Sequence, residues 1–128
     1  HRSAYDWLPM PVVSIQNGSH QSGLVMAGNH SDEYEGQVTL SRLARSLEAD
    51  DISGHLVLLP MSNYPAARPG RRTSPIDEGN LNRNFPGDLR GTITQMIAHM
   101  IEEELRPEVH FLVDLHSGGS SLMYLPST

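Results

Sequence analysis

The sequence contains no cysteine and no lysine, and aromatic residues make up only 5% of it. Without cysteine the protein cannot form disulfides, which agrees with a cytoplasmic origin. No apolar run approaches the ~20 residues that a membrane-spanning helix needs, so we expect no membrane partner. The formal net charge of −6 argues against general nucleic-acid binding, so we expect no nucleic-acid partner either.

The nine basic residues are all arginine, and they are unevenly distributed along the chain. Five of them fall in one segment: Arg68, Arg71, Arg72, Arg83 and Arg90. A planar guanidinium group can bind a carboxylate through two hydrogen bonds. This segment of an acidic protein is therefore a candidate site for a small anionic ligand. The alternative interpretation is a solvated surface loop.

Short apolar runs alternate with segments of helical periodicity along the 128 residues, which suffice for one domain with a core. Apolar spacing predicts a helix over 33–48, and the capping-box pair Thr92 and Gln95 predicts a second helix that ends before Pro107. The alternation indicates an α/β fold with a largely parallel sheet. Strands, buried in the three middle cases, are predicted from apolar runs at 11–15, 24–27, 55–59, 110–115 and 121–125.

The segment 61–91 has no periodicity and is rich in Pro, Gly, Asn and Arg. So long an irregular stretch within a compact domain is usually functional or disordered. Asn82 and Arg83 are adjacent polar groups that can bind a carboxylate, and Arg72 is a candidate for polarising a carbonyl. The alternative is a surface loop without a function.

Two predicted strands end in residue types that bind metal ions. His30 and Glu33 follow the run 24–27, and His116 follows the run 110–115. In such folds, bound molecules and ions lie at the carboxyl ends of the strands, and His30 and Glu33 would meet His116 at that edge. Two imidazoles and one carboxylate occupy three of the four coordination positions of zinc and leave the fourth for water, as in catalytic zinc sites. The alternative is a surface pair at a helix start and a separate hydrogen-bonded histidine.

Asp114 lies two residues before His116, so both side chains point to one face of the strand. The aspartate either orients an imidazole or is a buried structural carboxylate. The remaining histidines have no ligand-like neighbours, and we interpret them as structural or exposed: His1, His20, His55, His99 and His110.

Three ordered motifs lie along the chain: GNHSDEYEG at 28–36, NLNRNFPG at 80–87 and VDLHSGG at 113–119. Together they resemble the succinylglutamate desuccinylase/aspartoacylase family, a branch of the zinc-carboxypeptidase-like enzymes. The resemblance implies a three-layer α/β fold of the zinc-carboxypeptidase type, with a mostly parallel or mixed central sheet flanked by helices. The stretch 72–77 looks most similar to the branch that deacetylates N-acetyl-diaminobutyrate.

The resemblance implies that His30, Glu33 and His116 bind one Zn²⁺ per chain. It implies zinc-dependent hydrolysis of a small N-acyl amino acid by metal-activated water. Ser31 stands where the family commonly has glycine. The catalytic glutamate of the family lies beyond Thr128, so we expect residues 1–128 to be the N-terminal, zinc-binding part of a catalytic domain. We expect this part to be inactive alone, and its open sheet edges could drive association, for instance as a homo-oligomer.

The resemblance also gives roles to the irregular segment. It implies that Asn82 and Arg83 hold the substrate carboxylate and that an upstream arginine stabilises the oxyanion. We expect Arg72 to have this last role, with Arg71 as the reserve candidate at the same substrate site.

Three other functions fit parts of the sequence. A zinc carboxypeptidase acting on peptides would use the same carboxylate-binding residues. A non-catalytic module that binds a small acid would need no catalytic glutamate. A serine hydrolase would use Ser117, which lacks the Gly-x-Ser-x-Gly arrangement of the common nucleophile turn.

Overall fold

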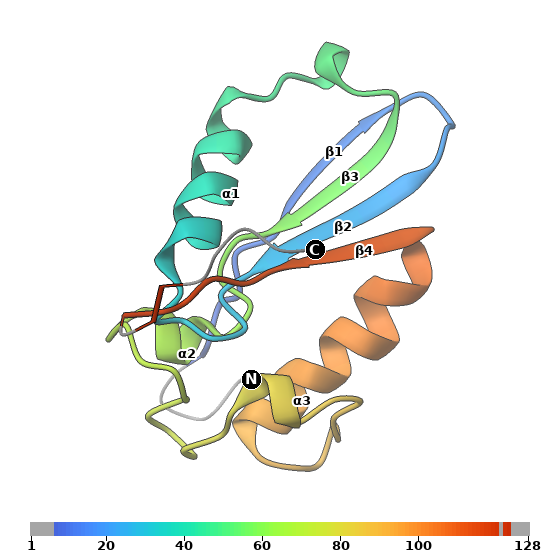
Figure 1. Cartoon of the computed structure of the whole chain (residues 1–128). Helices are drawn as coiled ribbons and strands as arrows, with labels where there is room; N and C mark the ends of the chain where they lie inside the picture. The colour runs from blue at the N-terminus through green and yellow to red at the C-terminus, as the bar shows by residue number, and fades with distance from the viewer. Residues whose placement is uncertain (1–6, 121, 124–128) are drawn as a thin grey trace.

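One mixed sheet forms the centre of the molecule, which is a computed structural model describing residues 7–120 and 122–123. The strand order is β1-β3-β2-β4 (Figure 1). Strand β2 pairs in parallel with both β3 and β4, whereas β1 pairs antiparallel with β3. The predicted mixed sheet is thus confirmed. The strands are β1 (Val13–Asn17), β2 (Ser22–Ala27), β3 (Gly54–Leu59) and β4 (Phe111–Leu115).

Helices cover both faces of this sheet. The predicted helix over 33–48 is confirmed as α1 (Tyr34–Ser46). The predicted capping box is formed by Thr92 and Gln95 at the start of α3 (Ile93–His99). The helical path then continues through a π-helical turn (Met100–Leu105) and a 3-10 turn (Arg106–Glu108).

The helical path therefore ends after Pro107, not before it as the sequence predicted. Pro107 lies at the start of the last 3-10 turn, where no helical carbonyl needs its missing N–H. The irregular segment 61–91 also contains two short helical turns, α2 (Tyr64–Ala67) and a 3-10 turn (Leu81–Arg83).

The two helical layers pack on alternate residues of the same strands. Leu24 and Met26 of β2 belong to the core beneath α3, together with Ala98 and Ile101. Ala27 of β2 belongs to the core beneath α1, which also includes Leu40 of that helix. Because successive side chains of a strand point to opposite faces, the fold has three layers, with the sheet in the middle (Figure 1).

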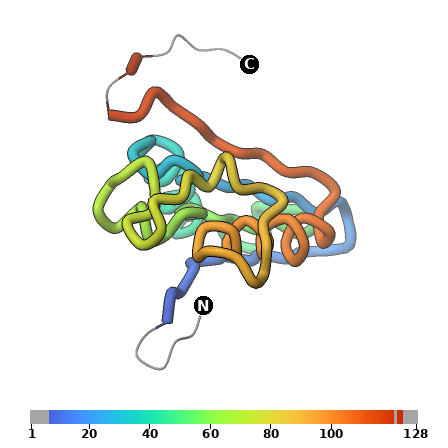
Figure 2. Tube along the Cα trace, turned by 90° about the horizontal axis from the view of Figure 1, so that it is seen from below, coloured from blue at the N-terminus to red at the C-terminus, as the bar shows by residue number. Residues whose placement is uncertain are grey.

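Strand β4 lies at the edge of the sheet. The sequence predicted a buried strand here, but β4 is partly exposed. Its residues Phe111, Leu112 and Val113 are 48%, 39% and 41% exposed. Among the described residues only β2 pairs with β4, so the outer edge of β4 has no partner strand there. Figure 2 shows the segment that follows this strand on the side of the molecule away from the first described residues.

Two further expectations concern a strand near the C-terminus and membrane-spanning helices. Of the strand predicted over 121–125, positions 121, 124 and 125 lie outside the described residues, and Leu122 and Met123 are in no strand. In the described part of the chain, no helix is long and apolar enough to cross a membrane.

Candidate metal centre

A tight turn at the end of β2 carries the first candidate ligands. Gly28 has a φ of +75°, a left-handed conformation that glycine adopts without steric cost. A Cβ atom at this position would lie 3.3 Å from the backbone of Met61. The hydroxyl of Ser31 donates to the carbonyl of Gly28 and closes the turn. The turn thereby places His30 at the carboxyl edge of the sheet, ahead of α1.

His30, Glu33 and His116 converge at this edge. Nδ1 of His30 lies 2.9 Å from Oε1 of Glu33, and Nδ1 of His116 lies 2.9 Å from Oε2 of the same carboxylate. One ligand atom from each residue lies within 4.8 Å of the other two. His30 and Glu33 are buried, whereas His116 is exposed on one side. The predicted trio therefore forms a single cluster that is open to solvent.

The surroundings of Glu33 favour its charged form. Burial opposes ionisation, but the N–H of Ser117 donates to Oε2 at 3.0 Å and both imidazoles contact the carboxylate. Together these contacts lower the pKa of Glu33 below its ordinary value. The group is therefore a carboxylate at neutral pH, which is the form that binds a metal ion.

The second nitrogen of His116 decides how its ring is oriented. Nε2 lies 2.9 Å from Oδ2 of Asp114, an acceptor that holds the proton on Nε2. Nδ1 faces Oε2 of Glu33 at 2.9 Å, and a proton or metal ion between the two groups would stabilise that arrangement. Asp114 thus orients an imidazole, one of the two interpretations that the sequence left open.

This donor set fits zinc. Two imidazole nitrogens and one carboxylate oxygen are ordinary ligands of a catalytic zinc ion, which keeps its fourth position for water or substrate. In addition, Nε2 of His30 is buried and has no hydrogen-bond partner among the described residues. The cluster therefore has polar groups that contacts within the described chain do not satisfy.

The two adjacent arginines of the irregular segment point to different partners. Nη1 of Arg72 lies 3.4 Å from Oε1 of Glu33 and 3.8 Å from Oδ1 of Asp32, with its side chain half exposed. Arg71 instead forms an exposed ion pair with Glu78 at 2.9 Å. The structure thus brings Arg72 to the cluster and directs Arg71 toward Glu78.

Asn82 and Arg83 lie in the 3-10 turn Leu81–Arg83. Oδ1 of Asn82 accepts a long hydrogen bond of 3.5 Å from Nδ2 of Asn29, which lies next to the cluster. The guanidinium of Arg83 is exposed and donates to the carbonyl of Asn82. Asn82 is therefore linked to the centre through Asn29, whereas the side chain of Arg83 is exposed and donates only to the carbonyl of Asn82 among the described residues.

Two neighbours of the centre were not predicted from the sequence. Asn29 is 1% exposed and donates to Oδ2 of Asp114 at 2.9 Å. Glu35 accepts the hydroxyl hydrogen bond of Ser117, which lowers the pKa of Glu35. The only signal in the sequence was their position beside His30 and Glu33. The Ser117 hydroxyl has no histidine partner among the described residues, so the arrangement of a serine nucleophile with its base is not formed there.

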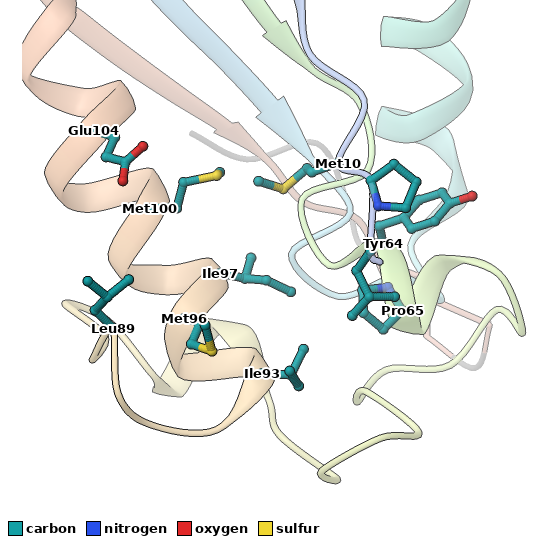
Figure 3. Close-up of a pocket in the computed structure, with 11 residues that line it drawn as sticks. Met10, Tyr64, Pro65, Leu89, Ile93, Met96, Ile97, Met100 and Glu104 are labelled. Atoms are coloured by element: carbon teal, nitrogen blue, oxygen red, sulfur yellow. The ribbon is translucent and has the colours of Figure 1, made fainter. Parts of the chain in front are cut away.

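A separate apolar cavity of about 290 Å³ lies between α2, α3 and the segment before β1 (Figure 3). Its lining includes Met10, Tyr64, Ile97 and Met100. It contains no residue of the His-Glu-His cluster and few polar groups that converge. The His-Glu-His cluster, and not this cavity, is therefore the candidate functional site.

Comparison with known proteins identifies the family. The profile of the succinylglutamate desuccinylase/aspartoacylase catalytic domain matches residues 19–128. The chain belongs to this family. The resemblance that the three sequence motifs carry is thus confirmed, and the matched region includes His30, Glu33 and His116.

Among curated members and relatives, similarity is high to N-alpha-acetyl-L-2,4-diaminobutyric acid deacetylase of Halomonas elongata. The two sequences are 44% identical over 124 residues, which cover 97% of this chain and 36% of that protein. Murein peptide amidase A of Escherichia coli strain K12 is 38% identical over 80 residues, covering 62% of this chain and 30% of that protein. The chain therefore spans about a third of the length of these proteins.

Solved structures of the succinylglutamate desuccinylase/aspartoacylase family have the same fold. A succinylglutamate desuccinylase from Silicibacter sp. superposes with a TM-score of 0.84 at 50% identity, covering 86% of this chain and 33% of that chain. The product-bound ectoine utilization protein EutE (DoeB) from Ruegeria pomeroyi gives a TM-score of 0.83 at 49% identity, covering 85% of this chain and 33% of that chain. The predicted fold class is confirmed.

Proposed function

We propose that the complete protein hydrolyses the amide bond of a small N-acyl amino acid, with one zinc ion held by His30, Glu33 and His116. The convergence of their three ligand atoms within 4.8 Å carries this proposal. When bound, zinc polarises the acyl carbonyl and lowers the pKa of a bound water. The family membership and the 44% identity to a deacetylase support the same reaction class.

Within this proposal, each residue of the cluster has its own task. Glu33 is held as an anion by Ser117 and the imidazoles, and so balances the charge of a cation. Asp114 fixes the ring of His116 through Nε2. The general base is not among the three ligand residues, and we assign it to a glutamate outside residues 1–128, as the family resemblance implies.

Arg72 is the proposed oxyanion-stabilising residue. Its guanidinium lies 3.4 Å from Glu33, and its half-exposed side chain is free to approach a substrate at the cluster. A cation there donates hydrogen bonds to the oxygen that becomes negative when water attacks the acyl carbon. One well-placed donor of this kind contributes about 3–4 kcal/mol to the stability of the transition state.

Asn82 and Arg83 are proposed to hold the carboxylate of the substrate. Arg83 is exposed and its guanidinium donates only to the neighbouring carbonyl of Asn82 among the described residues, so most of its donors remain for a ligand. Asn82 is linked through Asn29 to the metal centre. Binding the substrate by its carboxylate orients the acyl group and lowers the entropic cost of reaction.

The name of the relative from Halomonas elongata supports N-acetyl-2,4-diaminobutyrate as the substrate to test first. Similarity to murein peptide amidase A makes peptide cleavage the second candidate. The absence of cysteine agrees with the cytoplasm as the proposed site of action.

The test is to measure hydrolysis of N-acetyl-diaminobutyrate, N-acetyl-aspartate and a panel of dipeptides by the complete protein. We expect release of acetate that stops when zinc is chelated and returns when zinc is added. Cleavage of dipeptides alone would favour the peptidase. A zinc-loaded protein that binds an acyl amino acid without cleaving it would instead be a small-acid binding module.

A further inference from the structure

Asn29 is a buried amide that contacts two different parts of the centre. It follows the turn at Gly28 and is 1% exposed. Its Nδ2 atom lies 2.9 Å from Oδ2 of Asp114 on β4 and 3.5 Å from Oδ1 of Asn82 in the irregular segment. The neighbouring carboxylate fixes which end of the amide faces it, because Oδ1 in that place would repel Oδ2 of Asp114. The contact therefore needs the donor that asparagine supplies.

The first contact extends to a proposed zinc ligand. Oδ2 of Asp114 accepts hydrogen bonds from both Nδ2 of Asn29 and Nε2 of His116, each at 2.9 Å. Asn29 and His116 thus share one carboxylate oxygen. Oδ1 of Asp114 has no hydrogen-bond partner among the described residues, so these two donors supply the hydrogen bonds that orient the carboxylate there. Removing the amide donor would let the carboxylate turn and release the ring of His116.

The second contact extends to the proposed substrate site. Asn82 lies in a 3-10 turn within a segment that has little regular structure, and the adjacent Leu81 is buried in the core beneath α3. The Asn29 amide connects this turn to the end of β2. A buried residue at the sheet edge thereby adds a polar contact between the proposed substrate-binding turn and the metal centre, beside the apolar packing of Leu81.

We propose that Asn29 is a positioning residue that holds His116, through Asp114, and Asn82 in fixed relation to each other. The inference rests on the proposed zinc centre. It does not require Asn29 to contact zinc or substrate. Loss of a hydrogen bond that orients a metal ligand typically weakens metal affinity by about 10- to 100-fold.

The test uses the complete protein and the variants Asn29→Leu and Asn29→Ala. Leucine has nearly the shape of asparagine but no donor, so it separates the lost hydrogen bond from a cavity. Asn63→Ala is the matched control, because Asn63 is also fully buried and its amide has no partner among the described residues. Zinc affinity is measured by competition with a chelator, and the coordination geometry by the visible absorption of Co²⁺ bound in place of zinc.

We expect both Asn29 variants to bind zinc about 10-fold more weakly than the parent and to alter the Co²⁺ spectrum. Asn63→Ala should keep the parental affinity and spectrum even if it melts at a lower temperature. In the active protein, Asn29→Leu should also raise KM, because Asn82 is displaced. Parental zinc affinity and spectrum in Asn29→Leu would overturn the proposal.

A double-mutant comparison shows whether Asn29 acts through Asp114. We expect Asn29→Leu to change zinc affinity less than twofold once Asp114→Ala is present. An equal loss in both backgrounds would overturn the proposal, because Asn29 would then act by another route. His116→Ala separates this result from the zinc centre itself: zinc binding that survives His116→Ala refutes the proposed function, whereas its loss beside an unaffected Asn29→Leu refutes the positioning role alone.

Discussion

Nδ1 of His116 lies 2.9 Å from Oε2 of Glu33, although 83 residues separate the two along the chain. The parallel pairing of β2 with β4, in which Ala27 is the partner of Leu115, brings the two strand ends together. The candidate metal centre thus bridges two neighbouring strands. Replacing a candidate ligand at the end of either strand should therefore disrupt metal binding, while the backbone at the end of the other strand stays unchanged.

His116→Ala should abolish stoichiometric zinc binding, because it removes one of the three proposed ligands and the group that faces Oε2 of Glu33. Elemental analysis of the folded, purified protein gives zinc per chain. His20→Ala is the control, since His20 is exposed and lies before the start of β2, whereas His30 follows its end. Equal zinc in His116→Ala and the parent would remove His116 from the ligand set.

Arg72→Ala should lower kcat by about 10²- to 10³-fold while zinc content stays unchanged, because an oxyanion donor acts mainly in the transition state. Steady-state kinetics on the N-acyl substrate measures this. Arg71→Ala is the matched comparison, since its guanidinium pairs with Glu78 and not with Glu33. A larger loss in Arg71→Ala than in Arg72→Ala would exchange the roles of the two residues.

Arg83→Ala should reduce kcat/KM for N-acyl amino acids by about 10- to 100-fold, mostly through KM, because a lost charged hydrogen bond costs roughly 1.5–3 kcal/mol. Arg90→Ala, another exposed arginine of the same segment, should leave the kinetics unchanged. A substrate amide in place of the carboxylate should also lessen the difference between Arg83→Ala and the parent. Unchanged kinetics in Arg83→Ala would exclude this residue from the substrate site.

Asp77 should stabilise the protein in a pH-dependent way. Burial opposes its ionisation, but hydrogen bonds from the N–H and hydroxyl of Thr94, at 2.7 and 2.8 Å, lower its pKa from 3.8 to about 2. A pKa lowered by folding stabilises the native state at neutral pH, and this contribution disappears as the pH falls from about 4 to 2. Asp77→Asn should therefore lower the free energy of unfolding by about 1–2 kcal/mol at pH 7, allowing for partial solvent exposure.

Urea unfolding at pH 7 and pH 3 measures this difference. The gap between parent and Asp77→Asn should narrow at pH 3, where Asp77 is partly protonated in the unfolded chain. Glu103→Gln, an exposed carboxylate on the same helical path as Thr94, should show little change at either pH. A gap of the same size at both pH values would contradict the role of ionised Asp77.

The irregular segment shows how far sequence reasoning reached. Its polar composition indicated a binding function for Asn82 and for the arginines, but periodicity could not orient them. Arg71 and Arg72 are adjacent in sequence, yet one pairs with Glu78 and the other approaches Glu33. Their directions follow from the backbone path of a turn-rich segment, and no repeating pattern encodes that path.

The sequence alone determined the alternation of strands and helices, the start of α3 and the three candidate ligands, because these depend on local spacing and on residue chemistry. It also indicated Asp114, which shares a strand face with His116. Only the tertiary structure decided that Asp114 orients His116 and that Asn29 connects Asp114 to Asn82. It also decided that β4 is an exposed edge strand. These features depend on side chains that are distant in sequence and meet only when the strands pair.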